Sequence, residues 1–596
     1  MTAPIRVPTP RDSHMDYAAL GNGQVAALID ESANIAWMCL PRLDSDAVFN
    51  GLLGGEGVFR ITLESLKTSE QHHIRNTAML VTEMEDEAGA KIRITDFAPK
   101  FRAKGRDFRP VALVRRVEVL KGSPRLRVEL NPTFEYNSET HAPETGTSHL
   151  SWPGFRVSTN APITHVEAGT PFVPFTDTAF ILTPDESLSD EPTHIAREWE
   201  METRDWWQNW VKSLAVPLDY QESVIRAAIG LRLCVFEDTG GVVAALTTSI
   251  PEHKGSERNW DYRYCWIRDA YFAVNALARL SDLGSRDAYG NWLMGVATAY
   301  AGKPIQPLFG IGLETKIEEW VADALPGFEG HAPVRVGNAA YTQVQNDVYG
   351  QIILGLVAHF FDARREHLFG ETEFSLLEKI GETAVDKWSE PDAGIWEFRE
   401  SQSVHTSSVM FCWAACDRLS KVADHLGLDD RQSYWRDHAD TIREALLEHG
   451  YSEARKAFTA RFDGDELDAS LLLLNELGVL PADDERFVNT VERIDEELRS
   501  GNHVFRYVAK DDFGEPETAF TACTFWHIDA LHRIGRTEDA REMFENLLSC
   551  RSRFGLLSED IYCNDETLWG NYPQTYCLAG IIDCALRLSR PWHTVI

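Results

Sequence analysis

Connections of alternating length join the helical segments that follow residue 219, and this alternation restricts the fold more than any other feature. Apolar residues recur at helical spacing in twelve segments. We expect these helices to begin near Glu222, Asp269, Arg286, Gln345, Glu371, His405, Asp430, Asp468, Asp483, Ala519, Thr537 and Gln574. Long segments precede the helices at 269, 345, 405, 468, 519 and 574, whereas the links before 286, 371, 430, 483 and 537 span only a few residues.

Short links make successive helices antiparallel neighbours, so every long loop emerges at the same end of the assembly. Six antiparallel pairs predict a closed double ring, an all-α (α/α)6 barrel, with six long loops around one rim. The alternative, an open solenoid of helix pairs, requires a repeat in the sequence, and none is detectable. Because function concentrates in long loops on a rigid scaffold, we expect the functional site at this rim.

The chain up to about residue 185 has a different periodicity. "KIRITDF" (91–97) and "RLRVEL" (125–130) place apolar residues at every second position, and "RPVALVRRVEVL" (109–120) is rich in branched residues. These strands predict an antiparallel β-sandwich. The segment "EPTHIAREWEMETRDWWQNWVKSL" has helical character, and its "DWWQNW" aromatics suit packing between domains better than the alternative, packing between subunits. We therefore predict a multidomain protein with a sandwich (1–190), a helical linker (191–218) and the barrel (219–596).

Charge and cysteine content narrow the class of protein. A net charge of −34 argues against nucleic-acid partners and anionic membrane surfaces but suits a neutral substrate such as a sugar, although solubility alone also explains it. The sequence contains no run of about 20 apolar residues, so it predicts no membrane-spanning helix. The start "MTAPIRVPTPRDSHMD" has no secretory pattern, and ten cysteines without a CxxC pair read as reduced thiols, so we expect a cytoplasmic protein. Cys412 and Cys416, one helical turn apart, suit the core better than a metal site.

The first long loop, "RNWDYRYCWIRDA" (258–270), is rich in groups that bind sugars. Sugar hydroxyls need fixed donors and acceptors, which Arg268 and Asp269 supply, and sugar C–H faces need flat aromatic surfaces. Trp266, Tyr262 and Tyr264 provide such surfaces. The alternative is an Arg–Asp salt bridge over aromatics buried beneath the loop.

Two glutamates in the long loops are candidates for the carboxyl pair that glycoside hydrolysis requires. Glu397 follows Trp396 in "GIWEF", an apolar setting that favours the protonated form of an acid catalyst. Glu559 in "LLSED" lies beside Ser558 and Asp560, which predicts a wetter setting suited to an ionised base. Among 92 acidic residues, these two positions alone do not establish catalysis.

Several motifs resemble those of a known family. "NWDYRYCWIRDAYF", "PVRVGNAA", "GIWEFR", "DELDASLLLL", "FTACTFWHIDAL" and "GLLSEDI" closely resemble bacterial members of glycoside hydrolase family 15, the glucoamylase-like enzymes. The segment "DYAALGNGQVAALIDESANIAWMCLPRLDSDAVF" resembles the start of their sandwich domain. The likeness extends in order from about residue 16 to residue 590, so chance is a poor explanation.

The resemblance implies a β-sandwich, a helical linker and an (α/α)6 barrel, and an inverting, exo-acting hydrolase that releases β-glucose from the non-reducing ends of short α-glucans. By motif, Glu397 is implied as the general acid and Glu559 as the general base, with carboxyl groups ~6.5–9.5 Å apart. The implied substrate-binding residues are Tyr262, Trp266, Arg268, Asp269, Arg335 and Trp396.

The sequence leaves alternatives open. Phe398 follows Glu397 where fungal members carry a second acidic residue, so fungal preferences beyond the first sugar do not transfer. Some bacterial members that resemble this chain are trehalases, so hydrolysis of α,α-trehalose is the alternative function. A phosphorolytic enzyme on a similar barrel and a non-catalytic sugar-binding protein are competing hypotheses. The chemistry requires no cofactor; a structural calcium ion stays open without identifiable ligands, and a homo-oligomer is compatible with the sequence.

Overall fold

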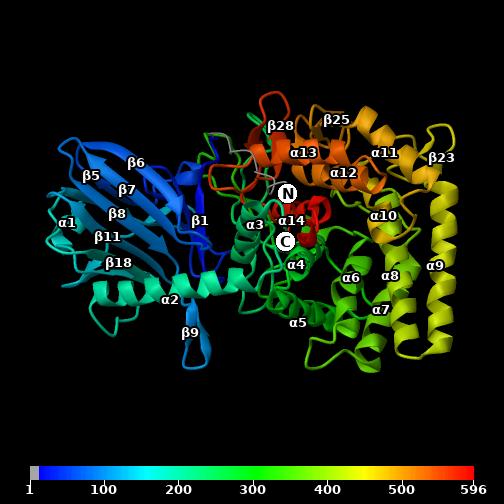
Figure 1. Ribbon diagram of the computed structural model, residues 1–596, viewed down its shortest axis with the longest axis horizontal. Helices are drawn as coiled ribbons and strands as arrows, with labels where there is room; N and C mark the ends of the chain where they lie inside the picture. Colours follow the sequence, from blue (N-terminus) through cyan, green and yellow to red (C-terminus); the bar gives the residue numbers. More distant parts are fainter. Residues whose placement is uncertain (1–12, 596) are drawn as a thin grey trace.

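A strand-rich amino-terminal half and a helical carboxyl-terminal half make up the protein (Figure 1). The computed structural model describes residues 13–595. Residues 1–12, which include most of the start in which we expect no secretory signal, lie outside the described residues.

The amino-terminal half is an antiparallel β-sandwich. Its large sheet has the order β15-β16-β17-β18-β11-β8-β7-β6. These strands span Glu144–Thr145 (β15), His149–Trp152 (β16), Phe155–Thr159 (β17), Thr178–Thr183 (β18), Leu113–Lys121 (β11), Lys91–Phe97 (β8), Leu80–Asp86 (β7) and Leu66–His73 (β6). The opposing layer holds β1 (Ala18–Gly21), β2 (Ala26–Ile29), β3 (Ile35–Cys39), β4 (Ala47–Phe49), and the pair β5 (Val58–Leu63) and β12 (Leu126–Asn131). One apolar core fills the space between the two layers. It includes Ala27 and Ile29 from this layer and Ile92 and Ile94 from the large sheet.

The sequence-predicted strands are confirmed because their alternation matches the burial. In β8, the residues "KIRITDF" span the predicted segment, with Ile92 and Ile94 fully buried. The other two predicted segments form most of β11 and β12. Two small hairpins complete this half: β9 (Phe101–Ala103) with β10 (Arg106–Phe108), and β13 (Thr133–Phe134) with β14 (Glu139–Thr140). A short helix, α1 (Ile163–Glu167), lies beside β12.

A long helix, α2 (Pro192–Ser213), runs along the outer face of the large sheet toward the helical half (Figure 1). Ile195 and Ala196 pack there on Phe97 and Ile181. Farther along, Trp207 joins the core of the helical half and is 1% exposed. The predicted packing of the "DWWQNW" aromatics between the two halves is therefore confirmed.

The described part of the carboxyl-terminal half contains twelve α-helices in two rings. The inner helices are α4 (Ile267–Arg279), α6 (Val348–Phe361), α8 (Thr406–His425), α10 (Leu473–Leu477), α12 (Thr521–Arg533) and α14 (Thr575–Leu588). The outer helices are α3 (Gln221–Cys234), α5 (Leu283–Tyr300), α7 (Glu371–Lys387), α9 (Asp429–His449), α11 (Glu485–Glu497) and α13 (Thr537–Ser549). Each inner helix contacts the next, and α14 contacts α4, so the ring closes. This arrangement is the predicted (α/α)6 barrel.

The fourth inner helix differs from the expected helix near Asp468. The chain first forms a 3-10 helix, Ala469–Leu472, and then only the five residues of α10. The Asp468 carboxylate accepts a hydrogen bond from the Ser470 N–H at 2.7 Å, which tightens this start. Gly478, in the left-handed conformation (φ +89°), ends the helix.

Short strands occupy the loops of the barrel, and several carry residues of the site described below. They are β19 (Cys265–Trp266), β20 (Leu308–Phe309), β21 (Trp320–Val321), β22 (Arg335–Val336), β23 (Tyr451–Ser452), β24 (Ala457–Phe458), β25 (Arg499–Ser500), β26 (His503–Val504), β27 (Ala519–Phe520), β28 (Asp560–Tyr562) and β29 (Thr567–Trp569). Cys412 and Cys416 lie fully buried on α8, as core residues. None of the helices between residues 13 and 595 combines the length and apolar character needed to cross a bilayer.

Candidate active site

A cleft of about 870 Å³, including its open mouth, lies where the long loops of the barrel meet. The loops around β19, around residue 397 and before α14 all contribute to its walls. Seven of the eight sequence-predicted site residues line it: Tyr262, Trp266, Arg268, Asp269, Trp396, Glu397 and Glu559. The structure therefore brings together residues that are up to 297 positions apart in the chain.

Glu397 occupies a tight turn on one wall of the cleft. Its backbone has φ +63°, a conformation that costs a non-glycine residue of order 1–3 kcal/mol and that clusters at functional sites. Its Oε1 accepts a hydrogen bond from Trp266 Nε1 at 2.7 Å and lies 3.5 Å from Arg268 Nη2. Gln343 Nε2 donates to the Glu397 carbonyl oxygen at 3.0 Å. Both the side chain and the main chain of Glu397 are thus held in place.

Glu559 lies deeper in the same cleft and is 3% exposed. Tyr262 donates its hydroxyl to Glu559 Oε1 at 2.5 Å. Burial, followed by the negative charge of Glu252, raises the pKa of Glu559 to about 8, against the opposing effects of Tyr262 and Arg506. Burial and the charge of Glu252 therefore favour the protonated form of Glu559.

The expected settings of the two glutamates are wrong. Ser558 and Asp560, which suggested a wet environment for Glu559, are themselves 0% and 1% exposed. The Glu397 side chain is 23% exposed and faces hydrogen-bond donors. Trp396 does not provide the expected apolar cover, because its indole N–H donates to Asp468 Oδ2 at 2.7 Å and its ring packs on Phe520. Neighbours in sequence do not determine exposure where the chain turns sharply.

Arg268 and Asp269 lie in the first turn of α4, beside Glu397. Arg268 Nη1 donates to the Ile395 carbonyl oxygen at 2.6 Å, and its Nε lies 3.3 Å from Asp269 Oδ1. Burial raises the pKa of Asp269 to about 6, and Arg268 opposes this shift. The pair presents planar donors and carboxylate acceptors at one place in the cleft, as sugar hydroxyls require.

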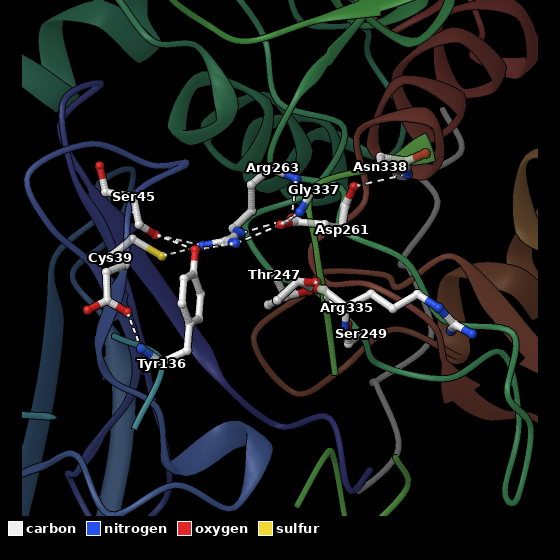
Figure 2. A network of polar contacts seen from close by, with 12 residues as sticks. Cys39, Ser45, Tyr136, Thr247, Ser249, Asp261, Arg263, Arg335, Gly337 and Asn338 are labelled. Atoms are coloured by element: carbon white, nitrogen blue, oxygen red, sulfur yellow. Dashed lines mark hydrogen bonds and ion pairs between the residues drawn. The ribbon is translucent and has the colours of Figure 1, made fainter. Parts of the chain in front are cut away.

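Arg335 and Tyr264 are placed differently from the other predicted groups. Neither Arg335 nor Tyr264 is among the described residues that line the cleft. The Arg335 guanidinium donates to the carbonyl oxygens of Glu257 and Asn259 at 2.9 and 2.8 Å. The Arg335 backbone is in turn held by Ser249 (Figure 2). Arg335 therefore supports the backbone of the first long loop, and its role in a sugar subsite stays a prediction.

Arg263, which the sequence reasoning did not select, anchors the same loop to the β-sandwich (Figure 2). It is fully buried and pairs with Asp261 through Nη2 at 2.6 Å and Nε at 2.9 Å. It also donates to the Ser45 carbonyl oxygen at 2.7 Å and the Tyr136 hydroxyl at 3.0 Å. The aspartate is held from the other side by the Gly337 N–H. Two opposite charges two residues apart were a signal in the sequence, but nothing there showed their burial.

A second buried ion pair lines the cleft close to Glu559 and was also missed. Arg506 Nη2 donates to both carboxylate oxygens of Glu252, at 2.9 and 2.7 Å. The partners are 254 residues apart, so no local spacing signals the pair. Since Glu252 raises and Arg506 lowers the pKa of Glu559, this pair adjusts the protonation of the carboxyl group.

Contacts between the loops hold together the part of the cleft wall that contains Asp511 and Asp512. Asp511 forms a two-pronged ion pair with Arg258. The next residue, Asp512, accepts hydrogen bonds from the backbone N–H groups of Arg399 at 2.6 Å and Glu400 at 3.3 Å. The loop at 511–513 is therefore attached to both the first long loop and the loop that carries Glu397.

The family model for glycosyl hydrolases family 15 matches residues 219–586, and a trehalase-like amino-terminal model matches residues 13–177. The chain belongs to glycosyl hydrolases family 15. Membership confirms the resemblance found in the motifs, and the protein is a glycoside hydrolase that acts on a sugar substrate.

Similar proteins show which family-15 enzymes this chain resembles. Trehalase from Mycobacterium tuberculosis is 31% identical over 99% of this chain and 91% of its own length. Trehalase from Thermoplasma volcanium is 30% identical over 96% of this chain and 93% of its own. A crystal structure of a bacterial glucoamylase complexed with acarbose has a TM-score of 0.68 at 12% identity, covering 99% of this chain and 96% of that one, which shows a shared fold. The comparisons favour the alternative function over hydrolysis of short α-glucans.

Proposed function

We propose that this family-15 enzyme hydrolyses α,α-trehalose to two glucose molecules with inversion at the attacked carbon. The observation that carries the proposal is the similarity to proteins named trehalase along nearly the full chain, including the sandwich. The main sequence prediction, release of β-glucose from short α-glucans, rests on the glucoamylase likeness, which extends only to the fold.

The bridged mouth of the cleft also supports a disaccharide substrate. A cleft lined by aromatic rings and a few charged side chains is typical of small-molecule sites. Asp511 and Asp512 line the cleft and attach their loop to Arg258 and to the backbone of Arg399. In the proposed binding mode, this loop limits the room for a longer glucan. Trehalose, which consists of two glucose units joined through both anomeric carbons, needs no room beyond the second unit.

In the proposed reaction, Arg268 and Asp269 hold hydroxyl groups of the glucose unit that is attacked. Glu397 donates its proton to the glycosidic oxygen, and the bond from this oxygen to the anomeric carbon breaks. Glu559 removes a proton from a water molecule that attacks the opposite face of that carbon. One β-glucose and one α-glucose leave the cleft, and water supplies the hydroxyl and the hydrogen that the products gain.

The proposed role of Glu559 as the base requires this residue to lose a proton when substrate binds. Without substrate, Trp266 and Arg268 present donors to Glu397, and burial favours the protonated form of Glu559. A glucose unit that engages Arg268 removes one donor from Glu397. The two roles come from the family resemblance, and a substrate with a better leaving group tests them.

Proton NMR of fresh reaction mixtures tests the substrate and the stereochemistry together. We expect trehalose to be hydrolysed with a kcat/KM at least about tenfold above those for maltose, isomaltose and maltotriose, and with equal initial amounts of α- and β-glucose. Faster hydrolysis of maltotriose than trehalose would restore the glucoamylase-like function. A need for inorganic phosphate and formation of glucose 1-phosphate would identify a phosphorolytic enzyme, and no turnover of any sugar would identify a binding protein.

A further inference from the structure

Three side chains of metal-binding types, none of which lines the cleft, converge in the barrel domain. His503 lies in β26, Cys550 ends α13, and Glu566 lies in the turn between β28 and β29. One ligand atom from each lies within 4.8 Å of the other two. These residues come from separate segments of the chain, so no short ligand spacing in the sequence signals the site.

His503 supplies an observation that points to a ligand. The residue is 1% exposed, yet neither ring nitrogen has a hydrogen-bond partner within the described part of the chain. Buried histidines ordinarily use both nitrogens, one as a donor and one as an acceptor. The nearest charged oxygen, Glu566 Oε1, lies 3.5 Å from His503 Nε2, which is too long for a good hydrogen bond.

The same 3.5 Å separation suits two ligands of one zinc ion. Tetrahedral coordination with Zn–N and Zn–O bonds of about 2.0–2.2 Å places such atoms ~3.3–3.5 Å apart. The Cys550 sulfur lies within 4.8 Å of the ligand atoms of His503 and Glu566. A movement of about 1 Å would bring it to the distance expected for a third ligand of a tetrahedral zinc ion.

The donor set identifies the class of ion. Imidazole nitrogen, thiolate sulfur and one carboxylate oxygen suit Zn²⁺, whereas Ca²⁺ requires six to eight oxygen ligands. Asn546 Nδ2 donates to Glu566 Oε1 at 3.0 Å and thereby orients the carboxylate. The Glu566 side chain is 18% exposed, which leaves a route for the ion and for a water molecule as the fourth ligand.

We propose that His503, Cys550 and Glu566 bind one Zn²⁺ ion, with water as the fourth ligand. Binding displaces the thiol proton of Cys550 to solvent. Cys550 and Glu566 bracket the segment that contains Glu559, and β28 begins at the residue directly after Glu559. The ion therefore ties the hairpin of β28 and β29 to the end of α13 and to β26, and it stabilises the loop on which Glu559 lies.

Metal analysis of the full-length protein, purified without an affinity tag, tests this site. We expect about one zinc per chain by mass spectrometry, and addition of Co²⁺ to the metal-depleted protein to produce a thiolate-to-cobalt absorption band. His503→Gln and Cys550→Ser should each weaken zinc binding at least about tenfold and abolish the band. Cys563→Ser is the matched control, since Cys563 lies in the same hairpin outside the cluster and should leave both unchanged.

The variants also distinguish a metal site from a packing role. If Cys550→Ser does not fold, Glu566→Gln gives the same test from the more exposed ligand. Zinc should raise the unfolding temperature of the wild-type protein and of Cys563→Ser but not that of the ligand variants. Absence of zinc at isolation and after titration, or equal zinc binding by Cys550→Ser and the wild type, would overturn the proposal. Neither result bears on the substrate, because metal content is measured without a sugar.

Discussion

The indole N–H of Trp266 donates to Glu397 across 2.7 Å, so the first long loop directly holds a carboxyl group of the opposite wall. Tyr262, four residues earlier, donates to Glu559 at 2.5 Å, and the Tyr262 and Trp266 rings meet edge to face at 5.6 Å. One pair of packed aromatic residues therefore sets the positions of both carboxyl groups.

Trp266→Phe tests this arrangement, because it keeps most of the ring and removes the donor to Glu397. Leaving an acceptor in the cleft without its donor costs about 1–3 kcal/mol, so we expect kcat/KM for trehalose to fall ~5–150-fold. Steady-state kinetics provide the measurement. Trp592→Phe, at an exposed position outside the cleft, is the control and should retain wild-type activity. Equal activity of all three proteins would show that the contact with Glu397 has no catalytic effect.

The roles of the two glutamates can be separated with α-glucosyl fluoride, whose leaving group needs little protonation. If Glu397 is the acid, Glu397→Gln should lose at least about 100-fold on trehalose but much less on the fluoride. Glu559→Gln should lose activity on both substrates, because the water still requires a base. Initial rates by fluoride release and by glucose release give the comparison. The opposite pattern would reverse the two assignments, in agreement with the protonation favoured in the substrate-free cleft.

The raised pKa of Glu559 predicts how stability depends on pH. With a folded-state pKa near 8 and an ordinary value of 4.5, the folded protein retains a proton that the unfolded chain releases between these values. The contribution of this group to stability therefore falls as pH rises through that window. The side chain in Glu559→Gln cannot ionise. The unfolding temperature of this variant, relative to that of the wild type, should therefore rise between pH 5 and pH 8. Scanning calorimetry at several pH values checks this, with Glu538→Gln, at an 86% exposed side chain, as the control.

Arg263→Met should destabilise the protein strongly, because it leaves the Asp261 carboxylate buried without its partner. Removal of one member of a buried ion pair costs about 3–5 kcal/mol. The double variant with Asp261→Asn should recover part of the loss, and thermal unfolding of the wild type, both single variants and the double variant gives the coupling. Arg102→Met, at a 75% exposed side chain, should have little effect. Additive effects of the two substitutions would contradict the coupling seen in Figure 2.

Asp512→Ala should broaden the substrate range by releasing the loop that crosses the mouth of the cleft. The substitution removes the acceptor for the N–H groups of Arg399 and Glu400. We expect the ratio of kcat/KM for maltotriose to that for trehalose to rise about tenfold. Asp512→Asn, which keeps an acceptor oxygen, should stay close to the wild type. An unchanged ratio in Asp512→Ala would mean that the mouth does not select for substrate length.

The sequence predicted the barrel well because connection length is a direct consequence of helix order. Eleven of the twelve α-helices begin within three residues of the expected position. The exception is the helix near Asp468. The Asp468 carboxylate caps the first turn and also accepts a hydrogen bond from the indole N–H of Trp396. A contact with a residue 72 positions away leaves no trace in local periodicity.

The sequence predicted which residues line the candidate site better than it predicted their exposure and their neighbours. Motifs placed Glu397 and Glu559 in one cleft, whereas their relative exposure followed from how the loops fold over each other. Glu252 with Arg506, and Asp261 with Arg263, escaped notice because a buried charge is defined by surroundings that assemble from distant segments. Arg335 was selected by motif, yet its guanidinium bonds to backbone rather than lining the cleft.

The contact of α14 with both α3 and α4 has a consequence for biosynthesis. The first and last helices of the double ring meet only after α14 has been synthesised and has left the ribosome. The β-sandwich, complete some 400 residues earlier in the chain, can fold during translation, whereas the enzyme cannot become active before its final helix is released.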